Sequence, residues 1–125
     1  MTVYDLTLAE LRAKLDKREI SSVEVTKTYL DRIAATNPAL NTFITICNET
    51  ALAEAQAADQ AIADGKAQAL TGLPIAAKDI FNTAGLRTTC ASRILDNYVS
   101  PYDATAIARI KEQKAVIVGK LNMDE

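Results

Sequence analysis

The sequence contains no histidine and no tryptophan, and aromatic residues make up only 5% of its 125 residues. Without histidine, neither a His-based catalytic triad nor a His/Cys zinc site can be built within this chain. The two cysteines, Cys47 and Cys90, are far apart and do not form a CxxC pair. Because rings are scarce while 49% of the residues are hydrophobic, the core must consist mainly of Ala, Leu, Ile and Val. This composition is typical of a packed α/β domain.

The chain also lacks an excess of charge and a long apolar run. Its 14 basic and 16 acidic residues are scattered and give a net charge of −2, so no basic stripe is available for a phosphate backbone. No segment approaches the ~20 apolar residues that a membrane span needs. The first residues do not have the basic-then-apolar order of a secretory signal. We therefore expect a cytoplasmic protein that contacts neither membrane nor nucleic acid directly.

The front of the chain, residues 6–36, reads as two amphipathic helices. Thr7-x-x-Glu10 and Ser21-x-x-Glu24 are capping boxes, in which the side chains at both ends satisfy backbone N–H groups of the first turn. Apolar residues follow each box at helical spacing. The dipeptide Asn37-Pro38 is expected to end the second helix.

Residues 40–65 are expected to form a strand and then a helix. The segment 40–46 is rich in β-branched residues and too short for a helix, so it predicts a strand. Asn48 is a candidate N-cap for the following alanine-rich helix, and Gly65 is suited to end it.

Residues 72–125 alternate between strand and helix patterns. The apolar run 73–81 and the run 115–118, closed by Gly119, predict buried strands, and Asp103 is a candidate N-cap for a helix between them. Strand, helix and strand in this order predict a right-handed crossover and a parallel pair. So few strands make an incomplete sheet, and we expect only part of a larger α/β fold.

Lys78 is the anomaly of the sequence, because it is a cation within the apolar run 73–81. Desolvation at such a position favours the neutral amine, which can accept a proton from a hydroxyl or attack a carbonyl. Asp79 is a poor partner for it, since successive strand side chains point to opposite faces. The ordinary alternative is a lysine that extends from a sheet edge into solvent.

Lys78 also lies in a series of blocks that resembles the amidase signature family, and within it the A subunits of aspartyl/glutamyl-tRNA amidotransferases. Four blocks occur in order and at matching spacing, and with Leu8-Ala9-Glu10-Leu11 and Leu40-Asn41-Thr42-Phe43-Ile44 at the front the resemblance covers essentially the whole chain. The four blocks are Gly72-Leu73-Pro74-Ile75-Ala76-Ala77-Lys78-Asp79, Gly85-Leu86-Arg87-Thr88-Thr89-Cys90-Ala91-Ser92, Pro101-Tyr102-Asp103-Ala104-Thr105 and Val116-Ile117-Val118-Gly119-Lys120-Leu121-Asn122-Met123-Asp124-Glu125.

The resemblance implies a mixed sheet flanked by helices, with residues 1–125 as the N-terminal portion of one amidase domain. It also implies a Ser-cisSer-Lys triad in which Lys78 is the catalytic lysine, while both serines would follow Glu125. The serines present are explained by helix starts or lack a Gly-rich neighbourhood that could aim N–H groups at an oxyanion. The isolated chain is therefore expected to be inactive.

The function implied by the resemblance is hydrolysis of glutamine, with the ammonia used to transamidate misacylated Glu-tRNA(Gln) or Asp-tRNA(Asn). The implied partners are the B and C subunits of a heterotrimer, and misacylated tRNA and ATP with Mg would bind through a partner subunit. No cofactor or metal is expected in this chain. Gly119-Lys120 lacks the upstream glycine spacing of a P-loop.

Two other functions stay open at this point. Lys78 could form a Schiff base with a carbonyl substrate, which borohydride trapping would detect. Alternatively, the chain could be an α/β interaction or assembly module without catalysis, in which the two front helices form the docking face.

An incomplete sheet also predicts behaviour in solution. An uncovered strand edge presents unpaired N–H and C=O groups, so we expect the isolated chain to self-associate or to exchange strands. Light scattering at high protein concentration measures this, and a well-behaved monomer would contradict the expectation.

Overall fold

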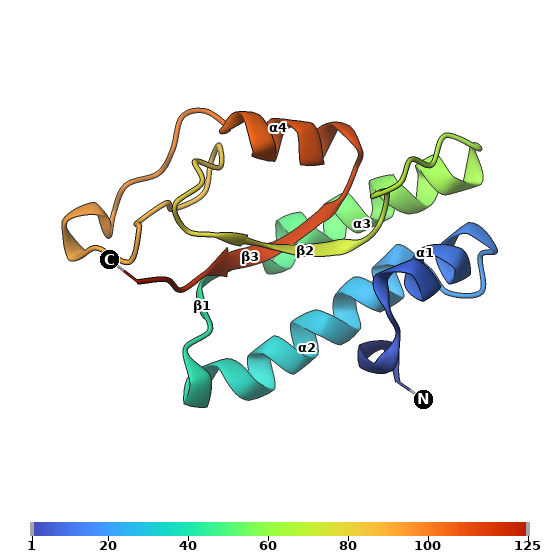
Figure 1. Cartoon of the computed structure of the whole chain (residues 1–125), viewed down its shortest axis with the longest axis horizontal. Coiled ribbons are helices and arrows are strands. Elements are labelled where there is room, and N and C mark those ends of the chain that lie inside the picture. Colours follow the sequence, from blue (N-terminus) through green and yellow to red (C-terminus); the bar gives the residue numbers. More distant parts are fainter. Residues whose placement is uncertain (1, 125) are drawn as a thin grey trace.

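A mixed sheet with helices on both faces organises residues 2–124, the part of the chain that the computed structural model describes (Figure 1). The last residue of the final sequence block, Glu125, lies outside this range. The elements in chain order are η1 (Val3–Asp5), α1 (Leu8–Asp16), α2 (Ser22–Leu40), β1 (Phe43–Ile46), α3 (Asn48–Ala63), β2 (Pro74–Lys78), η2 (Arg93–Leu95), α4 (Thr105–Glu112) and β3 (Val116–Leu121).

Both capping boxes predicted from the sequence are confirmed. The Thr7 hydroxyl accepts a hydrogen bond from the Glu10 N–H at 3.2 Å, and the Glu10 carboxylate accepts one from the Thr7 N–H at 2.7 Å. Ser21 and Glu24 make the same pair of bonds at the start of α2. The start of each helix could be predicted because capping depends on residues only three positions apart.

The predicted end of α2 is wrong. The helix continues through Pro38 to Leu40 and ends at Asn41, which has a left-handed φ of 51°. The proline lies in the last turn, where its fixed φ suits the helix and its missing N–H costs one bond. Asn37 instead holds the start of β1, since its side-chain amide accepts from the Phe43 N–H and donates to the Phe43 carbonyl. The helical front therefore extends beyond residue 36.

Two predicted caps are also wrong, although the helices exist. Asn48 is the first residue of α3, and the N-cap is Cys47 without a side-chain bond. Asp103 precedes the N-cap of α4, and its carboxylate accepts from the Ala84 N–H and from the Lys111 ammonium. Gly65 follows the end of α3 with a φ of +73°, as predicted. For Asp103, tertiary partners have replaced the local cap.

The sheet has the order β1-β3-β2. β2 and β3 are parallel, as the strand-helix-strand pattern predicted, and β1 runs antiparallel to β3. β3 extends to Leu121, so Gly119 does not close the strand as expected. Gly119 pairs with Ile46 of β1, and a Cβ there would overlap the Thr45 carbonyl oxygen and lie 2.7 Å from the Phe43 ring. Within residues 2–124, the outer edge of β2 has no strand partner, which agrees with an incomplete sheet.

Successive residues of β3 face different layers of the fold. Val116 and Val118 pack against buried side chains of α2 and α3, among them Leu30 and Ala55. Ile117 faces the opposite side and packs with Ala77 and with Ile107 of α4. Helices α2 and α3 therefore cover one face and α4 covers the other (Figure 1).

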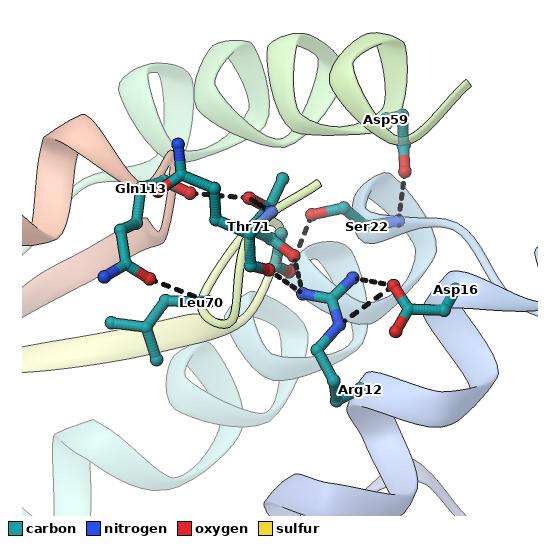
Figure 2. A network of polar contacts seen from close by, with 9 residues as sticks. Arg12, Asp16, Ser22, Asp59, Leu70, Thr71 and Gln113 are labelled. Atoms are coloured by element: carbon teal, nitrogen blue, oxygen red, sulfur yellow. Dashed lines mark hydrogen bonds and ion pairs between the residues drawn. The ribbon is translucent and has the colours of Figure 1, made fainter. Parts of the chain in front are cut away.

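A polar network holds the helical front to the segment that leads into β2 (Figure 2). Arg12 of α1 pairs with Asp16 and donates to the Thr71 carbonyl. The Thr71 hydroxyl donates to the Gln113 carbonyl at the end of α4, and the Ser22 hydroxyl donates to the Gly72 carbonyl. The start of β2 is thus tied to three helices.

In the described part of the chain, no helix has both the length and the apolar character needed to cross a membrane.

The close approach of β1 to Gly119 gives a prediction about this residue. Gly119→Ala places a methyl group against backbone and an aromatic ring, so we expect a loss of about 3 kcal/mol in the free energy of unfolding. Gly65→Ala is the matched control, because its Cβ would meet nothing within 4 Å and only its positive φ costs energy, about 1 kcal/mol. Thermal or denaturant unfolding measures both, and equal losses would contradict the close approach.

Candidate active site

Lys78 is the last residue of β2, not the middle of a longer strand. Its side chain is 50% exposed, and its ammonium lies 4.0 Å from the Asp124 carboxylate. Ile80 and Phe81, expected as buried neighbours, are themselves exposed. The expectation that Lys78 is buried among apolar side chains is therefore wrong for residues 2–124. The reason is that the chain leaves the sheet after Lys78, and the described residues leave half of its side chain open to solvent.

The position of Lys78 is nevertheless one at which active sites are commonly built. Lys78 pairs in register with Leu121, so the two parallel strands end together. Ligands of α/β proteins bind outside the carboxyl ends of parallel strands. An exposed amine at this edge is accessible to a reacting group supplied by another segment.

The buried lysine of this region is Lys120, which sequence reasoning missed. Its side chain is completely inaccessible to solvent and donates to the Phe81 carbonyl at 2.7 Å and to the Thr88 hydroxyl at 3.1 Å. Burial lowers the pKa of Lys120, and the neighbouring Asp79 carboxylate opposes that change. The buried lysine expected at position 78 is thus found at position 120, in the neighbouring strand β3.

Asp79 is the counter-charge of Lys120 and is equally inaccessible. Its Oδ1 lies 3.4 Å from the Lys120 Nζ and has no hydrogen-bond partner within residues 2–124. The cost of burying this oxygen is therefore offset by the ion pair. The Asp79 Oδ2 accepts from the Thr89 N–H at 2.9 Å and from the Thr89 hydroxyl at 2.5 Å. Asp79 therefore does not pair with Lys78, as strand alternation predicted.

A signal for this pair was present in the sequence. Lys120 follows the apolar run 115–118 after one glycine, and Asp79 lies in the apolar run 73–81, so two opposite charges occur near the carboxyl ends of strands predicted to be parallel and adjacent. Carboxyl ends of parallel strands lie at the same edge, and a buried charge requires a partner. Comparing the charges of the two strands would have indicated Asp79 and Lys120 as a candidate pair.

The serine hydroxyls of this chain have hydrogen-bond partners in the backbone. Ser21 and Ser92 accept hydrogen bonds from N–H groups at helix starts. The hydroxyls of Ser22 and Ser100 donate to backbone carbonyls of Gly72 and Tyr102. Within residues 2–124, none of the four is hydrogen-bonded to Lys78. Among residues 2–124 there is also no cluster of three or more His, Cys, Asp or Glu that could hold a metal ion.

The sequence profile of the family described as Amidase matches residues 24–125. The chain belongs to the amidase family. The family resemblance inferred from the sequence blocks is confirmed.

Individual amidase relatives match over nearly the whole chain. The A subunit of glutamyl-tRNA(Gln) amidotransferase from Geobacter metallireducens is 58% identical over 125 residues, which are 100% of this chain and 26% of that protein. The protein of the same name from Methylococcus capsulatus is 59% identical over 119 residues, covering 95% of this chain and 24% of that protein. The chain thus spans about a quarter of the length of these relatives.

Solved amidase structures share the fold. The peptide amidase from Stenotrophomonas maltophilia has a TM-score of 0.90 and 34% identity, with 97% of this chain and 25% of that chain covered. An amidase family protein from Bacillus anthracis has a TM-score of 0.88 and 32% identity over the same shares. The arrangement expected from the sequence, a mixed sheet flanked by helices as part of an amidase fold, is confirmed.

The buried pair gives a prediction about stability. Asp79→Asn leaves the Lys120 ammonium without a counter-charge, and we expect a loss of about 3–5 kcal/mol in the free energy of unfolding. The double variant Asp79→Asn with Lys120→Met removes both charges and should lose less than the single variant. Denaturant unfolding of the two proteins measures the difference. A double variant less stable than Asp79→Asn would contradict the ion pair.

Proposed function

We propose that this chain is the N-terminal part of a glutamine-hydrolysing amidase subunit that supplies ammonia for transamidation of misacylated Glu-tRNA(Gln) or Asp-tRNA(Asn). The observation that carries the proposal is the position of Lys78, an accessible amine at the carboxyl end of β2. The identity of 58% to the A subunit of a glutamyl-tRNA(Gln) amidotransferase, over the whole chain, supports the choice of glutamine and of the tRNA-dependent reaction.

In the proposed mechanism Lys78 is the base at the end of a proton relay. Its neutral amine accepts a proton from a serine in a cis peptide, and that serine takes the proton of the nucleophilic serine. The nucleophile attacks the glutamine amide carbon, the C–N bond breaks and ammonia leaves with a proton returned through the relay. Water then hydrolyses the acyl-enzyme to glutamate. The half-exposed side chain of Lys78 leaves room for the serines to approach.

The proposal places both serines in the part of the subunit that follows this chain. This agrees with the structural partners that occupy Ser21, Ser22, Ser92 and Ser100. The remaining part of the domain would also cover the exposed end of β2 and so desolvate the Lys78 amine, which favours its neutral form. The proposed partners are the B and C subunits of a heterotrimer, and ATP with Mg and tRNA would bind through them.

The role of Lys78 is tested in the full-length subunit that begins with this chain. Lys78→Met removes the base but retains the length of the side chain, and we expect the kcat of glutamine hydrolysis to fall about 10²–10⁴-fold. Lys66→Met is the matched control, because Lys66 is an exposed lysine outside this region, and its kcat should not change. Ammonia release measures turnover, and retained turnover in Lys78→Met would remove Lys78 from the mechanism.

The isolated chain provides a second measurement in the same assay. Because it would lack the nucleophile, the relay serine and the oxyanion donors, we expect no glutamine hydrolysis above the uncatalysed rate. Hydrolysis by the isolated chain that depends on Lys78 would contradict the proposed location of the serines.

A further inference from the structure

The Lys120 ammonium is attached to the turn that directly follows Lys78. The Phe81 N–H donates to the Lys78 carbonyl at 3.1 Å, which closes the turn. The Phe81 carbonyl accepts from the Lys120 Nζ at 2.7 Å. On the other side of the turn, the Asp79 N–H donates to the Leu121 carbonyl of β3. The backbone that carries Lys78 is therefore fixed to β3 at two points, one of which is a buried cation.

Asp79 holds a second segment, residues 88–90, at the same end of β2. Its Oδ2 holds the Thr89 N–H and hydroxyl, and the Asp79 backbone carbonyl accepts from the Cys90 N–H at 3.1 Å. Lys120 adds the bond to Thr88. Residues 88–90 are thus held beside the end of β2, although the segment between the strand and this point is irregular. The loop cannot shift without breaking bonds to a buried charge.

The loop held in this way carries backbone strain. Cys90 and Ala91 have consecutive left-handed φ values of 52° and 56°, a conformation that non-glycine residues adopt at a cost of about 1–3 kcal/mol each. Their N–H groups bond to the Asp79 carbonyl and the Thr89 hydroxyl, so the Asp79 contacts stabilise the strained form. Thr89 and Ala91 line a small pocket with Asn122, two residues before the Asp124 that faces Lys78. Such strain concentrates at functional sites.

Stability alone does not account for a buried ion pair at this place. Replacing a buried pair with apolar side chains of similar volume is often neutral or stabilising, because the pair must recover the desolvation of two charges. What apolar side chains cannot do is hold the Phe81 carbonyl, the Thr88 hydroxyl and the Thr89 N–H at fixed positions. The pair is therefore best explained by the geometry that it imposes.

We propose that Lys120, paired with Asp79, is a positioning residue for the amidase reaction: it fixes the Lys78–Phe81 turn and the 88–91 loop so that the Lys78 amine is held where it receives the proton. The proposal rests on the function proposed above for Lys78. It assigns Lys120 no contact with substrate, and its effect is transmitted through the Phe81 carbonyl and the Thr88 hydroxyl.

The test compares two double neutralisations in the full-length subunit with its partner subunits. Asp79→Asn with Lys120→Met removes the buried pair without leaving an unpaired charge. Displacement of a catalytic group by about 1 Å can cost about 100-fold in rate, so we expect kcat for glutamine to fall about 10- to 100-fold. The KM for glutamine should stay within about threefold, since the change affects the transition state and not uniform binding.

The matched control is Asp103→Asn with Lys111→Met. This pair, 2.8 Å apart, ties the other end of the same irregular segment to α4 and is partly exposed. Its removal should leave kcat and KM within about threefold of the wild type, because it does not touch the Lys78 turn. Melting temperatures and elution volumes of both double variants establish that folded complexes are compared.

Each result has a defined meaning. A folded Asp79→Asn, Lys120→Met enzyme with unchanged kcat, or with a raised KM alone, overturns the positioning role. If that variant does not fold, Thr88→Val decides, because it removes one hydroxyl bond to Lys120: a kcat loss of about fivefold or more at constant KM supports the proposal, and unchanged kcat overturns it. Retained turnover in Lys78→Met would instead overturn the proposed function, so the two failures are distinguishable.

Discussion

The ion pair between Asp79 and Lys120 is the interaction on which the arrangement around Lys78 depends. It joins the end of β2, the end of β3 and the loop that contains Thr88 and Thr89. Both side chains are inaccessible to solvent, and the ammonium has two hydrogen-bond acceptors in addition to the carboxylate beside it. A charge buried in this way is tolerated only when its partners are in place, so the pair specifies one geometry for three segments.

The two lysines of this region have opposite environments. Lys120 is buried and paired, which suits a group that holds backbone in place. Lys78 is half exposed, with the Asp124 carboxylate 4.0 Å from its ammonium, so the amine is accessible to a reactant. The sequence of each strand does not show which lysine is buried and which is accessible, because each follows a run of small or β-branched residues. The difference arises from where each strand ends and from which loop covers it.

The remainder of the fold serves to place this edge of the sheet. α2 and α3 bury one face and α4 the other, while the network of Arg12, Thr71 and Gln113 fixes the entry to β2 (Figure 2). β2 is thus held at its beginning by helices and at its end by the ion pair, although its outer edge has no strand partner among residues 2–124. This explains how a strand with one free edge can present Lys78 in a defined position.

By itself, the sequence determined the features that depend on neighbouring residues: the two capping boxes, the alternation of strand and helix, the parallel pairing of β2 with β3, and the blocks that mark an amidase. Only the tertiary structure decided that α2 passes Pro38, that Asp103 binds Ala84 and Lys111 instead of capping α4, and that Lys120, not Lys78, is the buried cation. The physical reason is that burial and charge pairing depend on residues distant in the chain, such as Asp79 and Lys120, which meet only after the sheet has formed.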